Sequence, residues 1–112
     1  MKNEILALIE EMKADYYNWT VRCAKGELSD INKNMINAYN EGIRYEEGRK
    51  YIKILTENSV WGFIVAVDND KKFKKGDILM AAGYNAPARN KARGNVFDLE
   101  NYATRWVGAN YL

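Results

Sequence analysis

The stretch that most constrains the fold is residues 49–67, RKYIKILTENSVWGFIVAV. Two runs rich in β-branched and aromatic residues flank a polar triplet at 57–59, and this pattern predicts a β-hairpin. The second run is apolar on both faces of a strand, with Trp61, Phe63, Val65 and Val67 alternating with Val60, Ile64 and Ala66. A strand that is apolar on both faces is usually covered on both faces. We therefore expect residues 60–67 to lie centrally in a small sheet.

Two helices are expected before this hairpin. Apolar side chains at intervals of three and four predict an amphipathic helix over residues 4–25, with Asn3 as its N-cap and Gly26 as its stop. A second helix is expected to begin after Ser29, its N-cap, and to end at Gly42. Its buried stripe is expected to consist of Ile31, Met35 or Ile36, and Tyr39.

After the hairpin, residues 78–82 are predicted to form a third strand. Within residues 84–95, Pro87 suits the first turn of a short helix and Gly94 suits its end. A charged connector is expected at 43–48, and two short strands are expected at 96–99 and 103–107, with Trp106 in the core.

These elements predict an α+β fold in one domain, residues 1–112. A helical hairpin, residues 1–42, packs on a small, mostly antiparallel sheet of four to five strands built from residues 49–112. No segment after residue 49 is long enough for a parallel crossover helix, which argues against a doubly wound fold.

The composition excludes several chemistries. Because the chain has no histidine, it cannot form a Ser-His-Asp or Cys-His site, and most zinc sites are excluded. Cys23 falls on the apolar stripe of the first helix, which predicts a buried, inert thiol. Asp68 and Asp70 begin like a calcium loop, but Lys72 stands where a third oxygen ligand is expected, which favours a solvated turn. We predict no metal, no cofactor and no enzymatic activity.

Charge divides the chain into two halves. Residues 1–48 hold six Lys/Arg and nine Asp/Glu, and residues 49–112 hold eleven and six, so the halves carry −3 and +5. One interpretation is that the two halves attract each other or are solvated separately. The other is that the second half carries a basic binding face.

Two segments could form such a face. One is the lysine run at 71–75, and the other is the basic segment 84–95, whose arginines would share one helical face at i and i+4. The candidate binding residues are Tyr84, Asn85, Arg89, Lys91, Arg93, Asn95, Lys72, Lys74 and Lys75. Alternatively, the lysine run is a solvated edge, and the arginines brace the loop by pairing with acidic residues of the helical half.

The expected central strand also bears on assembly. A single helical layer covers one face of a sheet, whereas residues 60–67 are apolar on both faces. The uncovered face would suit a second copy of the chain, so the sequence favours a homodimer through that face.

The second half also resembles a known group of proteins. The segment SVWGFIVAVDNDKKFKKGDILMAAGYNAPARNKARGNVF and the later TRWVGANYL resemble small uncharacterised proteins encoded by tailed bacteriophages. The shared pattern joins a hairpin, a Lys-Gly-Asp turn, an Ala-Pro-Ala-Arg-Asn loop and a last segment with Trp. The resemblance covers residues 49–112 and implies a phage accessory protein acting in the cytoplasm of a bacterium, with no assigned catalytic residues.

Such phage proteins often bind host machinery. The resemblance therefore implies a non-catalytic protein that occludes or sequesters a host protein or ribonucleoprotein, for example as an anti-CRISPR-like antidefence inhibitor. The alternative is a nucleic-acid or nucleotide-binding module that uses the basic second half. No apolar run approaches the roughly 18–20 residues that span a bilayer, and the first residues lack a signal-peptide layout, so no membrane partner is expected.

Overall fold

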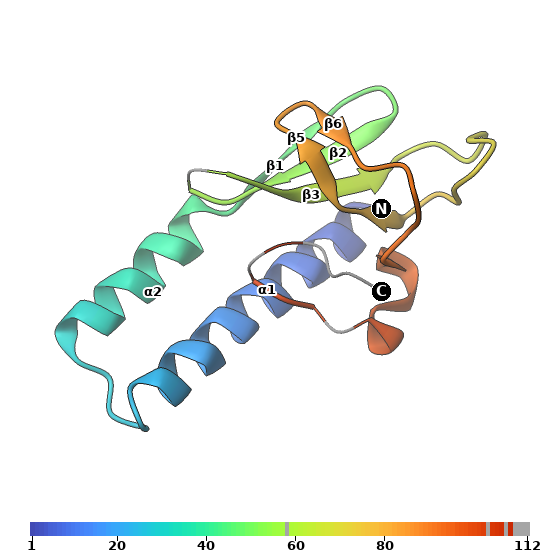
Figure 1. Ribbon diagram of the computed structural model, residues 1–112. Coiled ribbons are helices and arrows are strands. Elements are labelled where there is room, and N and C mark those ends of the chain that lie inside the picture. Colours follow the sequence, from blue (N-terminus) through green and yellow to red (C-terminus); the bar gives the residue numbers. More distant parts are fainter. Residues whose placement is uncertain (58, 103, 107, 109–112) are drawn as a thin grey trace.

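The computed structural model describes residues 1–57, 59–102, 104–106 and 108. Figure 1 shows a helical hairpin beneath a twisted sheet, and this confirms the α+β prediction. The elements in chain order are α1 (Lys2–Cys23), α2 (Asp30–Gly42), β1 (Arg44–Glu47), β2 (Tyr51–Leu55), β3 (Val60–Val65), β4 (Asp77–Leu79), β5 (Ala81–Gly83), β6 (Ala86–Pro87), β7 (Gly94–Asn95) and the 3-10 helix η1 (Val96–Asn101). The main sheet has the order β1-β2-β3-β4-β7, and its pairs are antiparallel.

The expected hairpin is β2–β3, and β3 lies in the middle of the sheet, as predicted. One detail differs. Ile54 pairs with Gly62 but Leu55 pairs with Val60, so Trp61 is an extra residue in a β-bulge. The bulge turns Trp61 to the helical side of the sheet, where it packs with Ile64. The prediction that Trp61 shares a face with Phe63 is therefore wrong.

Helix α1 supplies the core under the sheet. Ile5, Leu8, Ile9 and Met12 are buried against the sheet residues of the same cluster. The helix begins at Lys2 with Met1 as N-cap, so the prediction of Asn3 as N-cap is wrong.

The far end of α1 extends beyond the sheet. Its 22 residues span about 33 Å at ~1.5 Å per residue, and its last turns lie past the strands in Figure 1. Trp19 is 40% exposed there, and Cys23 is exposed. The predicted buried thiol is therefore wrong, because the apolar stripe continues past the surface that it could cover.

The predicted start and end of helix α2 are confirmed. Ser29 is its N-cap and forms a capping box with Asn32. Of the residues proposed for its buried stripe, Ile36 and Tyr39 are buried, whereas Ile31 is 72% exposed and Met35 is also exposed. The prediction of buried Ile36 and Tyr39 is therefore confirmed, and the prediction of buried Ile31 is wrong, as is the alternative with Met35.

The second face of the sheet is covered by the chain itself. The loop after β3 and the small β5–β6 sheet lie on the side opposite α1, as Figure 1 shows. They bury a second apolar cluster, which consists of Phe63, Val65, Phe73 and Leu79. The prediction that this face lacks a cover is wrong, and the argument for a homodimer through it is lost.

The segment after β4 differs most from expectation. Residues 87–93 form no helix: β6 is followed by an irregular loop and then by β7. The expected connector at 43–48 contains strand β1, and the expected strand at 96–99 lies in η1. The predicted strand at 103–107 includes positions outside the described residues, and the described residues 104–106 are not a strand. Trp106 is half-buried beside Tyr16 and Tyr39.

Candidate anion-binding site

The candidate site is built around Asp70, in the loop between β3 and β4. Its side chain is only 1% exposed. The carboxylate accepts hydrogen bonds from the backbone N–H groups of Lys72 at 2.8 Å and Phe73 at 3.0 Å, which closes the loop into a turn. Arg89 donates two parallel hydrogen bonds of 3.0 Å to the same carboxylate, and the Lys50 ammonium lies 3.4 Å away.

These contacts fix the charge of the pair. The Arg89 guanidinium, followed by the two backbone N–H groups, holds the pKa of Asp70 well below its usual range. In turn, the carboxylate of Asp70 raises the pKa of Arg89. The solvated turn predicted at Asp70 is therefore wrong. The bracing role considered for the arginines does occur at Arg89, but the acidic partner comes from the strand half and not from the helices.

Arg89 joins three further groups to this cluster. It donates a hydrogen bond to the hydroxyl of Tyr51, and its guanidinium carbon lies 4.9 Å from the centre of the Phe73 ring. The Lys72 ammonium donates to the Arg89 carbonyl at 2.6 Å. Residues 50–51, the loop 68–75 and the loop 88–93 are thus held together by one set of contacts.

A pocket of about 460 Å³ opens above Asp70. It is lined by Arg49, Lys50, Val67, Asn69, Asp70, Lys71 and Arg89. Four cations surround a single carboxylate whose oxygens already accept hydrogen bonds, so the pocket has a surplus of three positive charges. Such a concave, positively charged site suits an anionic ligand or surface.

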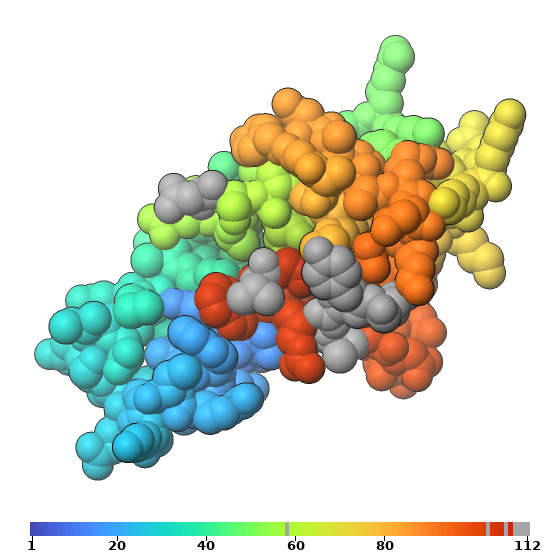
Figure 2. All heavy atoms as spheres, viewed as in Figure 1, coloured from blue at the N-terminus to red at the C-terminus, as the bar shows by residue number. Residues whose placement is uncertain are grey.

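A second pocket, of about 280 Å³, shares Arg49 and Lys50 with the first. It adds Lys53, Tyr51 and Asn85, together with two acidic residues of β1. We call Arg49, Lys50, Lys53, Lys71, Lys72 and Arg89 the basic face. In Figure 2 the green turn after β1 and the yellow loop 68–75 project from the same end of the molecule, beside the orange segment that carries Arg89.

The structure brings several predicted site residues to this face. Tyr84 is 59% exposed at the β5–β6 turn, and the Lys53 ammonium lies 4.2 Å from the centre of its ring. The same ammonium donates to the Asn85 side chain at 2.7 Å. Lys72 and Arg89 belong to the cluster around Asp70.

Other predicted residues lie elsewhere. Arg93 is buried and contacts Asn90, so the prediction that it shares a helical face with Arg89 is wrong. The Asn95 amide donates to the Lys75 carbonyl and to Asp77, which ties β7 to β4. The side chains of Lys74 and Lys91 are exposed. Lys75 lines a further pocket, beside the start of α1, which it shares with Arg49 of the basic face.

Sequence reasoning missed Arg49, Lys50 and Lys53 as site residues, and it included Lys71 only as part of the lysine run at 71–75. A signal for them was available, because an antiparallel hairpin places the residues before its first strand next to those after its second. The backbone N–H of Ala66 donates to the Lys50 carbonyl, so the chain entering β2 adjoins the chain leaving β3. The hairpin therefore places the turn at 49–50 beside the lysine run.

In comparisons with known proteins, no family model, no curated protein and no solved structure matches the chain. Within residues 1–57, 59–102, 104–106 and 108, no three Asp, Glu or Cys side chains lie close enough to hold a metal ion. No helix of that same part of the chain is long and apolar enough to cross a membrane. The site is therefore interpreted from its own chemistry.

Proposed function

We propose that this protein is a non-catalytic binding protein that occludes an acidic surface of a host protein through its basic face. The observation that carries the proposal is the surplus of three positive charges around one preformed pocket. The resemblance of residues 49–112 to proteins of tailed bacteriophages supports a phage-encoded antidefence factor that acts in the bacterial cytoplasm.

The build of the site favours binding over chemistry. The carboxylate of Asp70 accepts from two backbone N–H groups and from Arg89, so its lone pairs serve structure and are not directed at a substrate. The lysine and arginine side chains at its rim supply positive charge for recognition and no nucleophile for a reaction. A surface of this kind attracts and orients an anionic partner.

The contacts beneath the face also reduce the cost of binding. Arg89, Phe73 and Tyr51 hold three chain segments in one arrangement before any partner arrives. A preformed surface loses less conformational entropy on association than one that must order its loops. The same rigidity fixes the spacing of the charges, which gives selectivity for a matching acidic surface.

A nucleic acid is the second candidate partner. The observation that favours it is that most cations of the face outside the Asp70–Arg89 pair are lysines, which are depleted at protein–protein interfaces and bind phosphates as point charges. The exposed ring of Tyr84 could stack on a base.

The test uses a double charge reversal of two rim residues. Arg49 and Lys71 are exposed, line the pocket and lie outside the hydrogen bonds around Asp70. The matched control reverses Lys25 and Lys33, which are exposed on the helical hairpin, so both variants carry the same net charge. In a pulldown from bacterial lysate, a protein partner should be retained by wild type and by Lys25→Glu/Lys33→Glu, and lost by Arg49→Glu/Lys71→Glu.

Salt dependence separates the two candidates. With a single-stranded oligonucleotide as the probe, log affinity should fall by ~0.7 per phosphate contact for each tenfold rise in salt. Removing two contacts should then reduce the slope by about 1.4. A steep slope with no protein retained would favour nucleic acid, and equal retention by both charge-reversal variants would refute a role for the basic face.

A further inference from the structure

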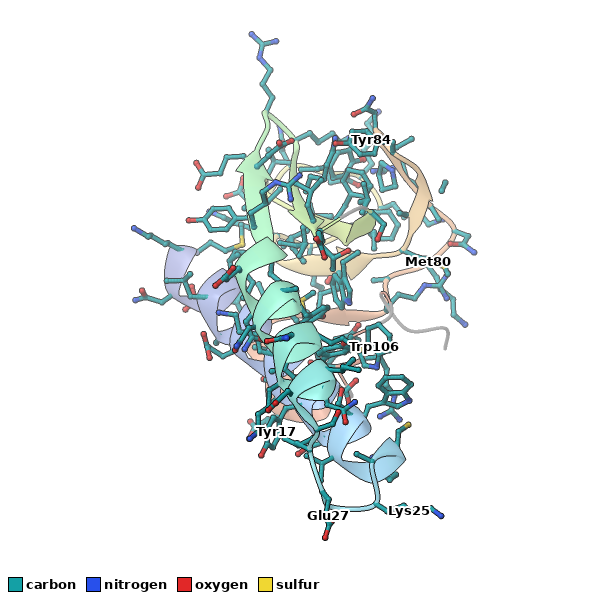
Figure 3. The ribbon with its side chains drawn as sticks, turned by 90° about the vertical axis from the view of Figure 1, so that its left-hand side faces the viewer. Tyr17, Lys25, Glu27, Met80, Tyr84 and Trp106 are labelled. Carbon is teal, nitrogen blue, oxygen red and sulfur yellow. The ribbon has the colours of Figure 1, made fainter. Side chains whose placement is uncertain are left out.

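A cluster of aromatic side chains lies away from the basic face, where α1 extends past the sheet. Four aromatic rings meet there. The ring centroids of Trp19 and Trp106 are 5.1 Å apart. The Trp106 centroid lies 4.8 Å from that of Tyr16 and 6.0 Å from that of Tyr39, and both pairs are T-shaped. Figure 3 shows Trp106 beside the helical hairpin, well away from Tyr84 on the sheet.

Two of these rings, Trp19 and Trp106, form one wall of a pocket. Its volume is about 390 Å³, and its lining residues are Asp15, Trp19, Arg22, Arg105 and Trp106. The volume lies toward the lower end of the roughly 300–1,000 Å³ typical of small-molecule sites. None of its lining residues belongs to the basic face, so the pocket is independent of the function proposed above.

The charges of the pocket favour an anion. Asp15 already accepts a hydrogen bond from the Trp106 backbone N–H at 2.9 Å and lies 3.9 Å from the Arg105 guanidinium. Arg105 is 59% exposed, and the Arg22 side chain is also exposed. Two guanidinium groups therefore reach solvent at the rim, where they repel a cationic ligand and can each form paired hydrogen bonds with a phosphate.

The aromatic wall favours a flat ring system. Trp19 lines the pocket and is 40% exposed, so part of its ring surface is open to a ligand. A Trp surface accepts any nucleobase by stacking, because each base has a π-face. An aromatic wall combined with arginines at the rim is also the combination that proteins use for unpaired nucleotides.

We propose that this pocket binds a nucleoside phosphate, with the base stacked on Trp19 and the phosphate held by Arg22 and Arg105. The ligand is a free nucleotide or the end of a nucleic-acid strand, since both present the same base and phosphate. The site needs no residue from the basic face.

Tryptophan fluorescence of the full chain tests the proposal. Two of the three tryptophans line the pocket, whereas Trp61 is buried in the core. Adenosine 5′-monophosphate should quench the emission saturably. Adenosine, which lacks the phosphate, and ribose 5-phosphate, which lacks the base, should each bind at least ~10-fold more weakly. The two sources are separated in the Arg49→Glu/Lys71→Glu variant, whose basic face is disrupted. There, a single-stranded oligonucleotide that binds no more tightly than the mononucleotide identifies a free nucleotide as the ligand, and tighter binding identifies a strand end.

The variant Arg22→Gln/Arg105→Gln should weaken binding of adenosine 5′-monophosphate by ~10-fold or more, with an unchanged far-UV circular dichroism spectrum. The matched control is Lys2→Gln/Lys33→Gln, which removes the same charge at two exposed positions outside both the basic face and this pocket, and should bind normally. Absence of saturable quenching, equal binding of ribose 5-phosphate, or equal losses in both variants would overturn the proposal.

Discussion

Replacing Trp61 by alanine should be among the most damaging single changes in this chain. The side chain is 2% exposed at the bulge of β3, and its indole N–H donates to the Arg105 carbonyl at 2.7 Å. Truncating a buried tryptophan to alanine costs about 3–5 kcal/mol, since the transfer energy is lost and a cavity remains. The lost hydrogen bond contributes about 0.5–1.5 kcal/mol more. A domain of this size has a total stability of about 5–15 kcal/mol, so the variant should lose a large part of its unfolding free energy.

Urea denaturation followed by far-UV circular dichroism measures this loss without relying on tryptophan emission. The matched variant Trp61→Phe keeps an aromatic ring in the core but removes the indole donor. Its loss of unfolding free energy should be smaller than that of Trp61→Ala, because less volume is left empty. A loss below about 1 kcal/mol for Trp61→Ala, as is common for surface positions, would refute the core assignment and the bulge that places the ring there.

Three further predictions concern other parts of the chain. Asp70→Asn should lower the urea midpoint. Because folding lowers the pKa of Asp70, the stabilising effect of its carboxylate is present above the ordinary pKa of 3.8 and is lost as the pH falls below that value. Urea titrations should therefore show that wild type loses more stability on acidification than this variant does. Gly94→Ala should destabilise the protein in the same assay, because a Cβ would lie 2.5 Å from the Tyr102 ring. The control Gly83→Ala, with nothing within 4 Å of its Cβ, should be near neutral, and equal losses in the two variants would contradict this packing. Cys23 should react with a thiol reagent in the native protein about as readily as in urea, and protection would show that it is buried.

The parts of the fold that were predictable are those in which short-range patterns act alone. The Ser29 cap, the end of α2 at Gly42 and the β2–β3 hairpin depend on neighbouring residues, and each was correct. The bulge at Trp61 was not predictable, because residues 60–67 are apolar on both faces and a shift by one residue leaves that pattern unchanged. Pro87 and Gly94 misled for a related reason: both suit helix ends, but they are equally suited to the short edge pairings that they form.

The site shows the same boundary between local and long-range information. The excess of lysine and arginine after residue 49 correctly indicated where positive charge gathers. It could not reveal that Arg89 is bound to Asp70, because those residues are 19 positions apart and meet only once both loops have folded over the sheet. The sequence also gave no indication of the pocket lined by Trp19 and Trp106. The aromatic residues of α1 fit a core-facing pattern, and only the structure shows that the helix extends past the strands.

The cluster around Asp70 has a consequence for how the molecule fluctuates. One carboxylate holds the backbone of the loop 68–75 and, through Arg89, the loop 88–93 as well. Neither loop can leave the sheet while its partner stays in place without exposing this ion pair and the Phe73 ring beneath it. The two loops should therefore open as a single cooperative unit, and amide hydrogen exchange in both should proceed with one shared opening free energy.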